Sequence, residues 1–107
     1  MTTFDPQTVL DSLEAEYAAR ATAIRRDLTA SHSADSAEQA GERQNDEVLQ
    51  ALLVEAEQGQ AQAAQAKLRL SGGSYGLCQR CGVAIAPARL QALPTAAFCL
   101  GCADLAE

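Results

Sequence analysis

The chain contains four cysteines, and they come in two close pairs. Two residues separate Cys78 from Cys81 and Cys99 from Cys102, and seventeen residues lie between the pairs. Two residues between cysteines allow both sulfur atoms to face one ion from a tight turn, and Gly82 directly follows the first pair. The spacing therefore predicts that all four cysteines bind one metal ion.

Four thiolates suit zinc, a borderline-soft cation that prefers a tetrahedron of ligands. Because protein side chains fill every position, no place remains for water or substrate, and the predicted zinc is structural. A redox-active dithiol pair and an iron–sulfur site are alternatives for the same cysteines. The spacing, and the absence of a strand–helix–strand pattern around the pairs, favour zinc.

Few apolar residues surround the cysteines. Those available for a core are Tyr75, Leu77, Val83, Ile85, Leu90, Leu93, Phe98 and Leu100. So small a core predicts that the metal supplies much of the folding free energy of this module.

The residues ahead of the cysteines predict two long helices. Asp5 and Pro6 favour a helix start. An Asp side chain can accept hydrogen bonds from the free backbone N–H groups of the first turn, and Pro at the first helical position lacks an N–H group that would have no partner there anyway. From there to about residue 30, apolar residues recur at steps of three and four: Leu10, Leu13, Tyr17, Ala21, Ile24 and Leu28. The polar segment 31–36 favours a reversal. A second helical pattern follows over about residues 36–70, and Gly72 and Gly73 are expected to end it.

The second helix carries a weaker pattern. We expect its packed side to include Val48, Leu49, Leu52, Leu53, Ala56, Ala63, Ala64, Lys67, Leu68 and Leu70. Gly59 and the surrounding Gln and Ala residues weaken the apolar signal. At ~1.5 Å per residue this helix is ~50 Å long against ~37 Å for the first, so we expect its last turns to extend beyond its partner.

The expected fold is mainly α. Residues 1–70 are predicted to form a long antiparallel two-helix coiled-coil hairpin, with a tip at about residues 31–40. Residues 71–107 are predicted to form a small four-cysteine zinc-finger module. On periodicity alone, the hairpin is either a spacer or a functional probe.

The charge and the hydropathy of the chain limit the classes of partner and the cellular location that we expect. The net charge is −6, and residues 1–70 hold six Lys and Arg against twelve Asp and Glu. Direct nucleic-acid binding needs clustered basic residues, so this balance argues against it and favours a basic protein surface. No apolar run is long enough for a membrane span or a signal peptide, so we expect a cytoplasmic protein, where thiols stay reduced and bind metal.

The cysteine segment resembles the DksA/TraR family of zinc-finger transcription regulators. The positions at family spacing are Tyr75, Gly76, Cys78, Cys81, Gly82, Ile85, Arg89, Leu90, Ala92, Pro94, Thr95, Cys99, Cys102, Leu105, Ala106 and Glu107. Gln79 departs from the acidic residue or Ser usual there. The resemblance implies a non-enzymatic regulator whose partner is bacterial RNA polymerase. In that family a coiled coil enters the secondary channel of the polymerase and brings its tip near the catalytic centre.

The resemblance also assigns tip residues. The family pattern is D-x-x-D-x-A, and counting back from the first cysteine places Asp35, Glu38 and Ala40 on its three positions, with Glu in place of the second Asp. Asp35 and Glu38 also fit a capping box, in which both side chains satisfy free N–H groups at the start of a helix. Two roles are therefore compatible with Asp35 and Glu38: they cap the helix and also contact the polymerase, or they only cap the helix.

Regulation by the alarmone ppGpp is not expected from the resemblance. Family members that respond to ppGpp carry basic residues at positions that here hold Gln62, Leu93 and Ala103. Two other functions remain alternatives. One is a zinc-stapled adaptor whose acidic hairpin docks on a different protein, and the other is a thiol redox switch.

Overall fold

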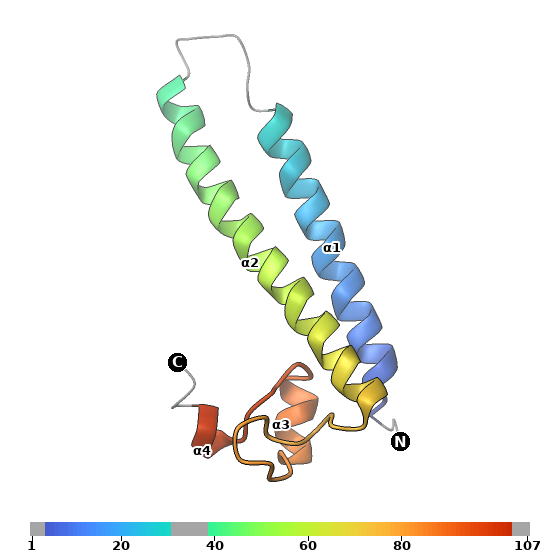
Figure 1. The fold of residues 1–107 in the computed structure, drawn as a ribbon. Helices are drawn as coiled ribbons and strands as arrows, with labels where there is room; N and C mark the ends of the chain where they lie inside the picture. Colours follow the sequence, from blue (N-terminus) through green and yellow to red (C-terminus); the bar gives the residue numbers. More distant parts are fainter. Residues whose placement is uncertain (1–3, 31–38, 104–107) are drawn as a thin grey trace.

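Two long helices dominate the structure (Figure 1). The computed structural model describes residues 4–30 and 39–103, and the side chains of residues 39–44 are not described. The chain runs through α1 (Pro6–Ala30), α2 (Gln39–Gly72), α3 (Pro87–Ala92) and α4 (Leu100–Ala103). Its extents of 56 × 31 × 25 Å reflect the length of the hairpin.

The start of α1 follows from Asp5 and Pro6. The Asp5 carbonyl accepts the Val9 N–H at 3.1 Å, and its carboxylate accepts the Thr8 hydroxyl at 2.6 Å. Pro6 occupies the first helical position, where its missing N–H would have no partner in the helix. The helix therefore begins where the sequence places it.

The end of α2 is set by a glycine, two residues later than the expected end near residue 70. Gly72 is still helical, and Gly73 takes a left-handed φ of 87° that favours glycine. The N–H groups of Ser74 and Tyr75 both donate to the Arg69 carbonyl, at 2.9 and 3.1 Å. These bonds satisfy the end of the helix and turn the chain toward the cysteines. The expected start of this helix near residue 36 lies outside the described residues.

The two long helices pack through leucine and isoleucine side chains of α1 and, over residues 56–66 of α2, through small residues. On α1, Leu10, Ala21 and Ile24 are buried, as the stripe predicts. On α2 the buried positions recur at steps of three and four: Ala56, Gly59, Ala63 and Ala66. Small residues permit close approach, so the Gln- and Ala-rich segment is part of the interface. Full burial of Leu10 alone contributes roughly 1.5–3 kcal/mol.

Charge pairs mark the register of the hairpin. The Lys67 ammonium lies 2.9 Å from a carboxylate oxygen of both Asp11 and Glu14. Nearer the tip, Arg25 pairs with Glu57 at 2.8 Å. The end of α2 therefore lies beside the start of α1.

The expected overhang of α2 at its C-terminal end is accordingly wrong. Gln7 shares a cavity lining with Leu68 and Ser71, which places the last turn of α2 against the first turns of α1. The extra length of α2 lies at the other end, where it extends past the end of α1 (Figure 1). The part of α2 that extends past α1 is therefore its beginning and not its last turns.

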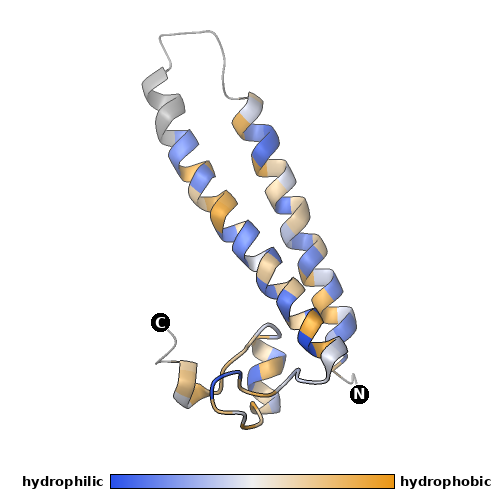
Figure 2. Cartoon of the chain, in the orientation of Figure 1, coloured by the Kyte–Doolittle hydropathy of each residue, from blue (hydrophilic) through white to orange (hydrophobic). Residues whose placement is uncertain are grey.

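Part of the expected apolar side of α2 is also wrong. Leu49, Leu53 and Ala56 pack toward α1, but Val48, Leu52 and Leu68 are exposed. The reason is geometric: α1 covers only one stripe along the surface of α2, so apolar residues of α2 outside this stripe stay exposed. Apolar and polar residues alternate along both helices (Figure 2). No helix in the described part of the chain is both long and apolar enough to cross a membrane.

The cysteine-containing segment lies at the base of the hairpin, beside the C-terminal end of α2 (Figure 1). Its described residues contain α3, α4 and an isolated antiparallel bridge between Leu77 and Ala84. Its buried residues are Cys78, Ile85 and Ala96. Four of the residues expected in its core are instead exposed: Leu77, Val83, Leu93 and Leu100. The apolar core is smaller than the composition suggests, while the expected fold class, a helical hairpin with a four-cysteine module, is confirmed.

Candidate metal centre

The first cysteine pair sits in a tight turn. Cys78 N donates to the Val83 carbonyl at 2.8 Å, and Gly82 N donates to the Cys78 carbonyl at 2.9 Å. Gly82 has a φ of 80°, a conformation that side chains with a Cβ rarely adopt. The turn brings Cys81 back over Cys78, so that Cys81 N lies 3.4 Å from the Cys78 sulfur and donates to it.

The second pair spans the start of α4. Cys102 N and Ala103 N both donate to the Cys99 carbonyl, at 3.1 and 2.8 Å. This short helical turn places the sulfur atoms of Cys99 and Cys102 on one side. Gln79 N, from between the first two cysteines, donates to the Ala97 carbonyl at 2.8 Å and joins the two pairs.

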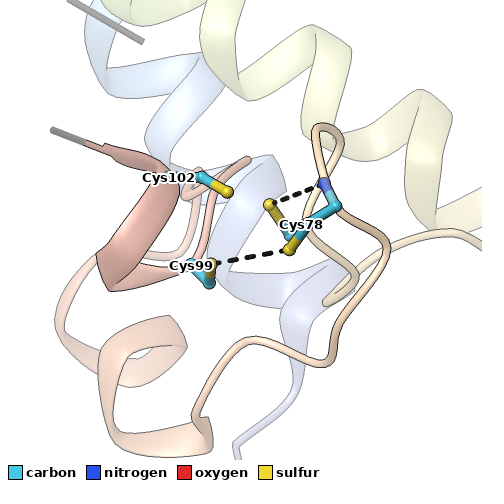
Figure 3. Close-up of side chains that lie close together, drawn as sticks. Cys78, Cys99 and Cys102 are labelled. Carbon is cyan, nitrogen blue, oxygen red and sulfur yellow. Dashed lines mark hydrogen bonds between the residues drawn. The ribbon is translucent and has the colours of Figure 1, made fainter. Parts of the chain in front are cut away.

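The four sulfur atoms converge. All lie within 4.8 Å of one another, and the Cys81 and Cys99 sulfurs are 3.7 Å apart. In Figure 3, the side chains of Cys78, Cys99 and Cys102 point toward a common centre. Sulfur atoms about 2.3 Å from one tetrahedral zinc ion are about 3.8 Å from each other, so the donor set fits such an ion.

The electrostatics of the cluster also favour a cation. Burial disfavours the Cys78 thiolate, but backbone N–H groups, that of Cys81 foremost, outweigh it and lower the pKa of Cys78 to about 5. At Cys102 burial and the neighbouring thiols, Cys99 first, act together and raise the pKa to about 12. The pKa of Cys81 is also raised, since burial and neighbouring sulfurs outweigh the Val83 N–H. The Cys78 thiol thus ionises easily, whereas the raised pKa values of Cys81 and Cys102 show that further negative charge in the cluster is costly without a cation.

Two family models match this chain. The DnaK suppressor protein-like N-terminal domain matches residues 7–69, and the prokaryotic dksA/traR C4-type zinc finger matches residues 73–107. The chain belongs to the DksA/TraR family. The family's zinc finger is of the C4 type, and the four cysteines here are positioned to bind one metal ion.

A solved structure supports the same assignment. The chain is similar to transcription factor DksA2 from Pseudomonas aeruginosa, with a TM-score of 0.86 and 25% sequence identity. The match covers 94% of this chain and 79% of the DksA2 chain. No curated protein sequence matches the chain.

The DksA/TraR tip residues expected from the sequence are only partly within the described structure. Asp35 and Glu38 lie outside the described residues. Ala40 lies in the first turn of α2, and its side chain is not described. Their assignment, and the capping box of Asp35 and Glu38, stay predictions.

The three positions associated with the alarmone come together. Gln62, Leu93 and Ala103 all line one cavity of about 430 Å³ between α2 and the zinc finger. The basic residue Arg89 also lines the cavity, and its Nε donates to the Phe98 carbonyl at 3.2 Å. The remaining lining comes from Thr95, Ala96, Ala97 and Phe98. The family resemblance grouped Gln62, Leu93 and Ala103, but nothing in the sequence grouped the other lining residues with them, because a cavity between a helix and a loop leaves no periodic signal.

Proposed function

We propose that the chain is a non-enzymatic transcription regulator that acts on bacterial RNA polymerase in the cytoplasm. Membership of the DksA/TraR family and the likeness to a transcription factor support a role in transcription. The hairpin enters the secondary channel of the polymerase, with its tip directed to the catalytic centre. There it alters the stability of initiation complexes.

The observation that carries this proposal is the geometry of the rod. α1 ends at Ala30 and α2 begins at Gln39, at the end of the hairpin away from the zinc finger (Figure 1). Asp35 and Glu38 belong to the segment that joins these two ends. A narrow helical pair can deliver such residues into a channel that a globular domain could not enter. In this proposal Asp35, Glu38 and Ala40 contact the polymerase.

The remaining parts have supporting roles. A zinc ion held by Cys78, Cys81, Cys99 and Cys102 fixes the base of the rod and takes no part in chemistry, because four thiolates leave it no open position. The net charge of −6 suits a protein surface better than a phosphate backbone, so the regulator needs no contact with DNA.

The test is transcription in vitro with purified polymerase. Wild-type protein is expected to change initiation at a responsive promoter, and Asp35→Asn to remove this effect while the circular dichroism spectrum stays the same. Asp27→Asn is the matched control, since it makes the same substitution at an exposed site on α1. Initiation that is indifferent to wild-type protein would refute the proposal.

The variants also separate the proposal from an adaptor function. If Asp35→Asn and Glu38→Gln are silent while changes on the exposed faces of α1 or α2 abolish binding to a partner, the chain is an adaptor. If they act without any loss of binding to polymerase, the tip works at the catalytic centre after docking.

A further inference from the structure

The segment immediately before Cys99 accepts hydrogen bonds from four parts of the chain. We call residues 94–98 the strap. Four of its carbonyl groups are used: Pro94 accepts Tyr75 Oη at 2.8 Å, Thr95 accepts Arg69 Nη2 at 3.3 Å, Ala97 accepts Gln79 N at 2.8 Å and Phe98 accepts Arg89 Nε at 3.2 Å. Backbone carbonyls so fully engaged hold a short irregular segment in one conformation.

These donors divide into two groups. Gln79 lies between the first two cysteines and Arg89 lies on α3, so their bonds hold the zinc finger together. Arg69 lies in the last turns of α2, and Tyr75 lies three residues past the end of that helix, with its N–H bonded to the Arg69 carbonyl. The bonds from Arg69 and Tyr75 therefore join the strap to the hairpin.

Arg69 acts at both ends of this connection. Its carbonyl accepts the N–H groups of Ser74 and Tyr75 and so turns the chain out of α2. Its guanidinium reaches the strap. Burial raises the pKa of Tyr75, against the opposing charge of Arg69, so the Tyr75 phenol remains a hydrogen-bond donor at ordinary pH. The two side chains donate to the adjacent carbonyls of Thr95 and Pro94 in the strap.

In the described part of the chain, the two short helices of the zinc finger do not pack against the hairpin. Among the helices that the structure describes, only α1 and α2 pack against each other. A cavity of about 430 Å³ lies between Gln62 of α2 and the finger residues Leu93 and Phe98. The bonds that Arg69 and Tyr75 make are therefore direct links between the end of α2 and the strap.

We propose that Arg69 and Tyr75 are positioning residues that lock the hairpin to the metal centre through the strap. A metal ion at the four cysteines holds Cys99 and, through Gln79 N, the strap. The strap in turn offers its carbonyls to Arg69 and Tyr75. Metal binding in the finger therefore sets the orientation of the hairpin relative to the finger. The interface between α1 and α2 lies outside the finger and does not involve the metal. This inference does not depend on the partner of the hairpin or on the proposed function.

The test is the measurement of amide residual dipolar couplings in the zinc-loaded full chain. Wild-type protein is expected to fit one alignment tensor for α1, α2 and residues 76–103 together. The double variant Arg69→Met, Tyr75→Phe is expected to need two different tensors, one for the hairpin and one for the finger. Zinc content should stay at the wild-type value, which shows that the finger is still folded.

The matched control is Arg89→Met, which removes an arginine bond to the same strap but within the finger. It is expected to keep one common tensor. A double variant that retains one common tensor with zinc bound would overturn the proposal, as would an Arg89→Met variant that separates the tensors equally. If the double variant loses zinc, each single variant is measured, and a common tensor in both zinc-loaded singles also overturns it.

Discussion

The ring of Tyr17 lies directly against the backbone of Gly59, across the interface between α1 and α2. A Cβ atom added at Gly59 would come within 2.5 Å of Cε1 of Tyr17. Arg20 covers the ring as well, with its Cζ 5.1 Å from the ring centroid. A glycine that looks like a helix defect is thus the position that accommodates the largest side chain of the interface.

Replacing this glycine should destabilise the hairpin. Gly59→Ala gains up to about 1 kcal/mol of helix propensity, but it forces the Tyr17 ring away, and overpacking costs about 1–3 kcal/mol. We expect a net loss of about 1 kcal/mol in the free energy of unfolding, measured by urea denaturation. Gly72→Ala is the control, because nothing lies within 4 Å of its added Cβ. Equal effects of the two substitutions would contradict this account of Gly59.

The Lys67 pairs predict a dependence of stability on pH. The hydrogen bond from Lys67, then that from Gln7, lowers the pKa of Asp11 below 3.8. A carboxyl group whose folded-state pKa is lowered contributes stability above its unfolded pKa and loses it as pH falls through the folded value. Wild-type protein should therefore be more stable than Asp11→Asn near neutral pH, and this difference should shrink below about pH 4.

The measurement is a series of urea unfolding curves at falling pH for both proteins. Asp27→Asn reports the effect of removing a carboxylate from the same helix. Raising the salt concentration should also narrow the difference between wild type and Asp11→Asn, since the pair is open to solvent. A difference that stays constant down to acid pH would show that Asp11 does not act through its charge.

The sequence predicted the parts of this structure that depend on local chemistry. The stripe of Leu10, Ala21 and Ile24 gave the packed face of α1, and the cysteine spacing indicated a shared metal centre, whose sulfurs the structure brings together. The sequence did not predict features that depend on how two helices pack against each other. Gly59 reads as a weak point until Tyr17 is placed opposite, and the register of α2 depends on Lys67 meeting α1.

The same reason explains the strap. Backbone carbonyls carry no sequence signal, so the bonds from Arg69 and Tyr75 could not be read in advance. Burial in the finger was overestimated for a related reason. Residues such as Val83 and Leu100 are apolar, but turns fixed by glycine and cysteine geometry leave them at the surface.

Removal of the metal should unfold one end of the molecule. The finger buries only Cys78, Ile85 and Ala96 among its described residues, which is too little apolar surface to hold it without an ion. A chelator, or Cys99→Ser, is expected to abolish zinc binding and the dispersed amide signals of residues 75–103. The helical circular dichroism of α1 and α2 should largely persist, because their interface lies outside the finger. A finger that stays folded without zinc would contradict this prediction.

Alarmone regulation can be tested at the cavity between α2 and the finger. With Gln62, Leu93 and Ala103 in its lining, we expect no detectable binding of ppGpp by titration calorimetry, and the same transcriptional effect with and without ppGpp. Introducing basic residues through Gln62→Lys, Leu93→Arg and Ala103→Lys together should create measurable affinity for the anion. Tight ppGpp binding by the wild-type chain would contradict the prediction that this cavity lacks the basic residues needed to bind ppGpp.

The most direct test of the central claim is to ask what the tip touches. A photocrosslinking side chain at position 36 is irradiated in the complex with purified RNA polymerase, and the crosslinked peptide is identified by mass spectrometry. We predict crosslinks to segments of the largest subunits that line the secondary channel beside the catalytic centre, with a matching probe at Gln91 crosslinking outside the channel. Crosslinks from position 36 to the outer surface of the polymerase, or none at all while the protein is bound, would contradict it.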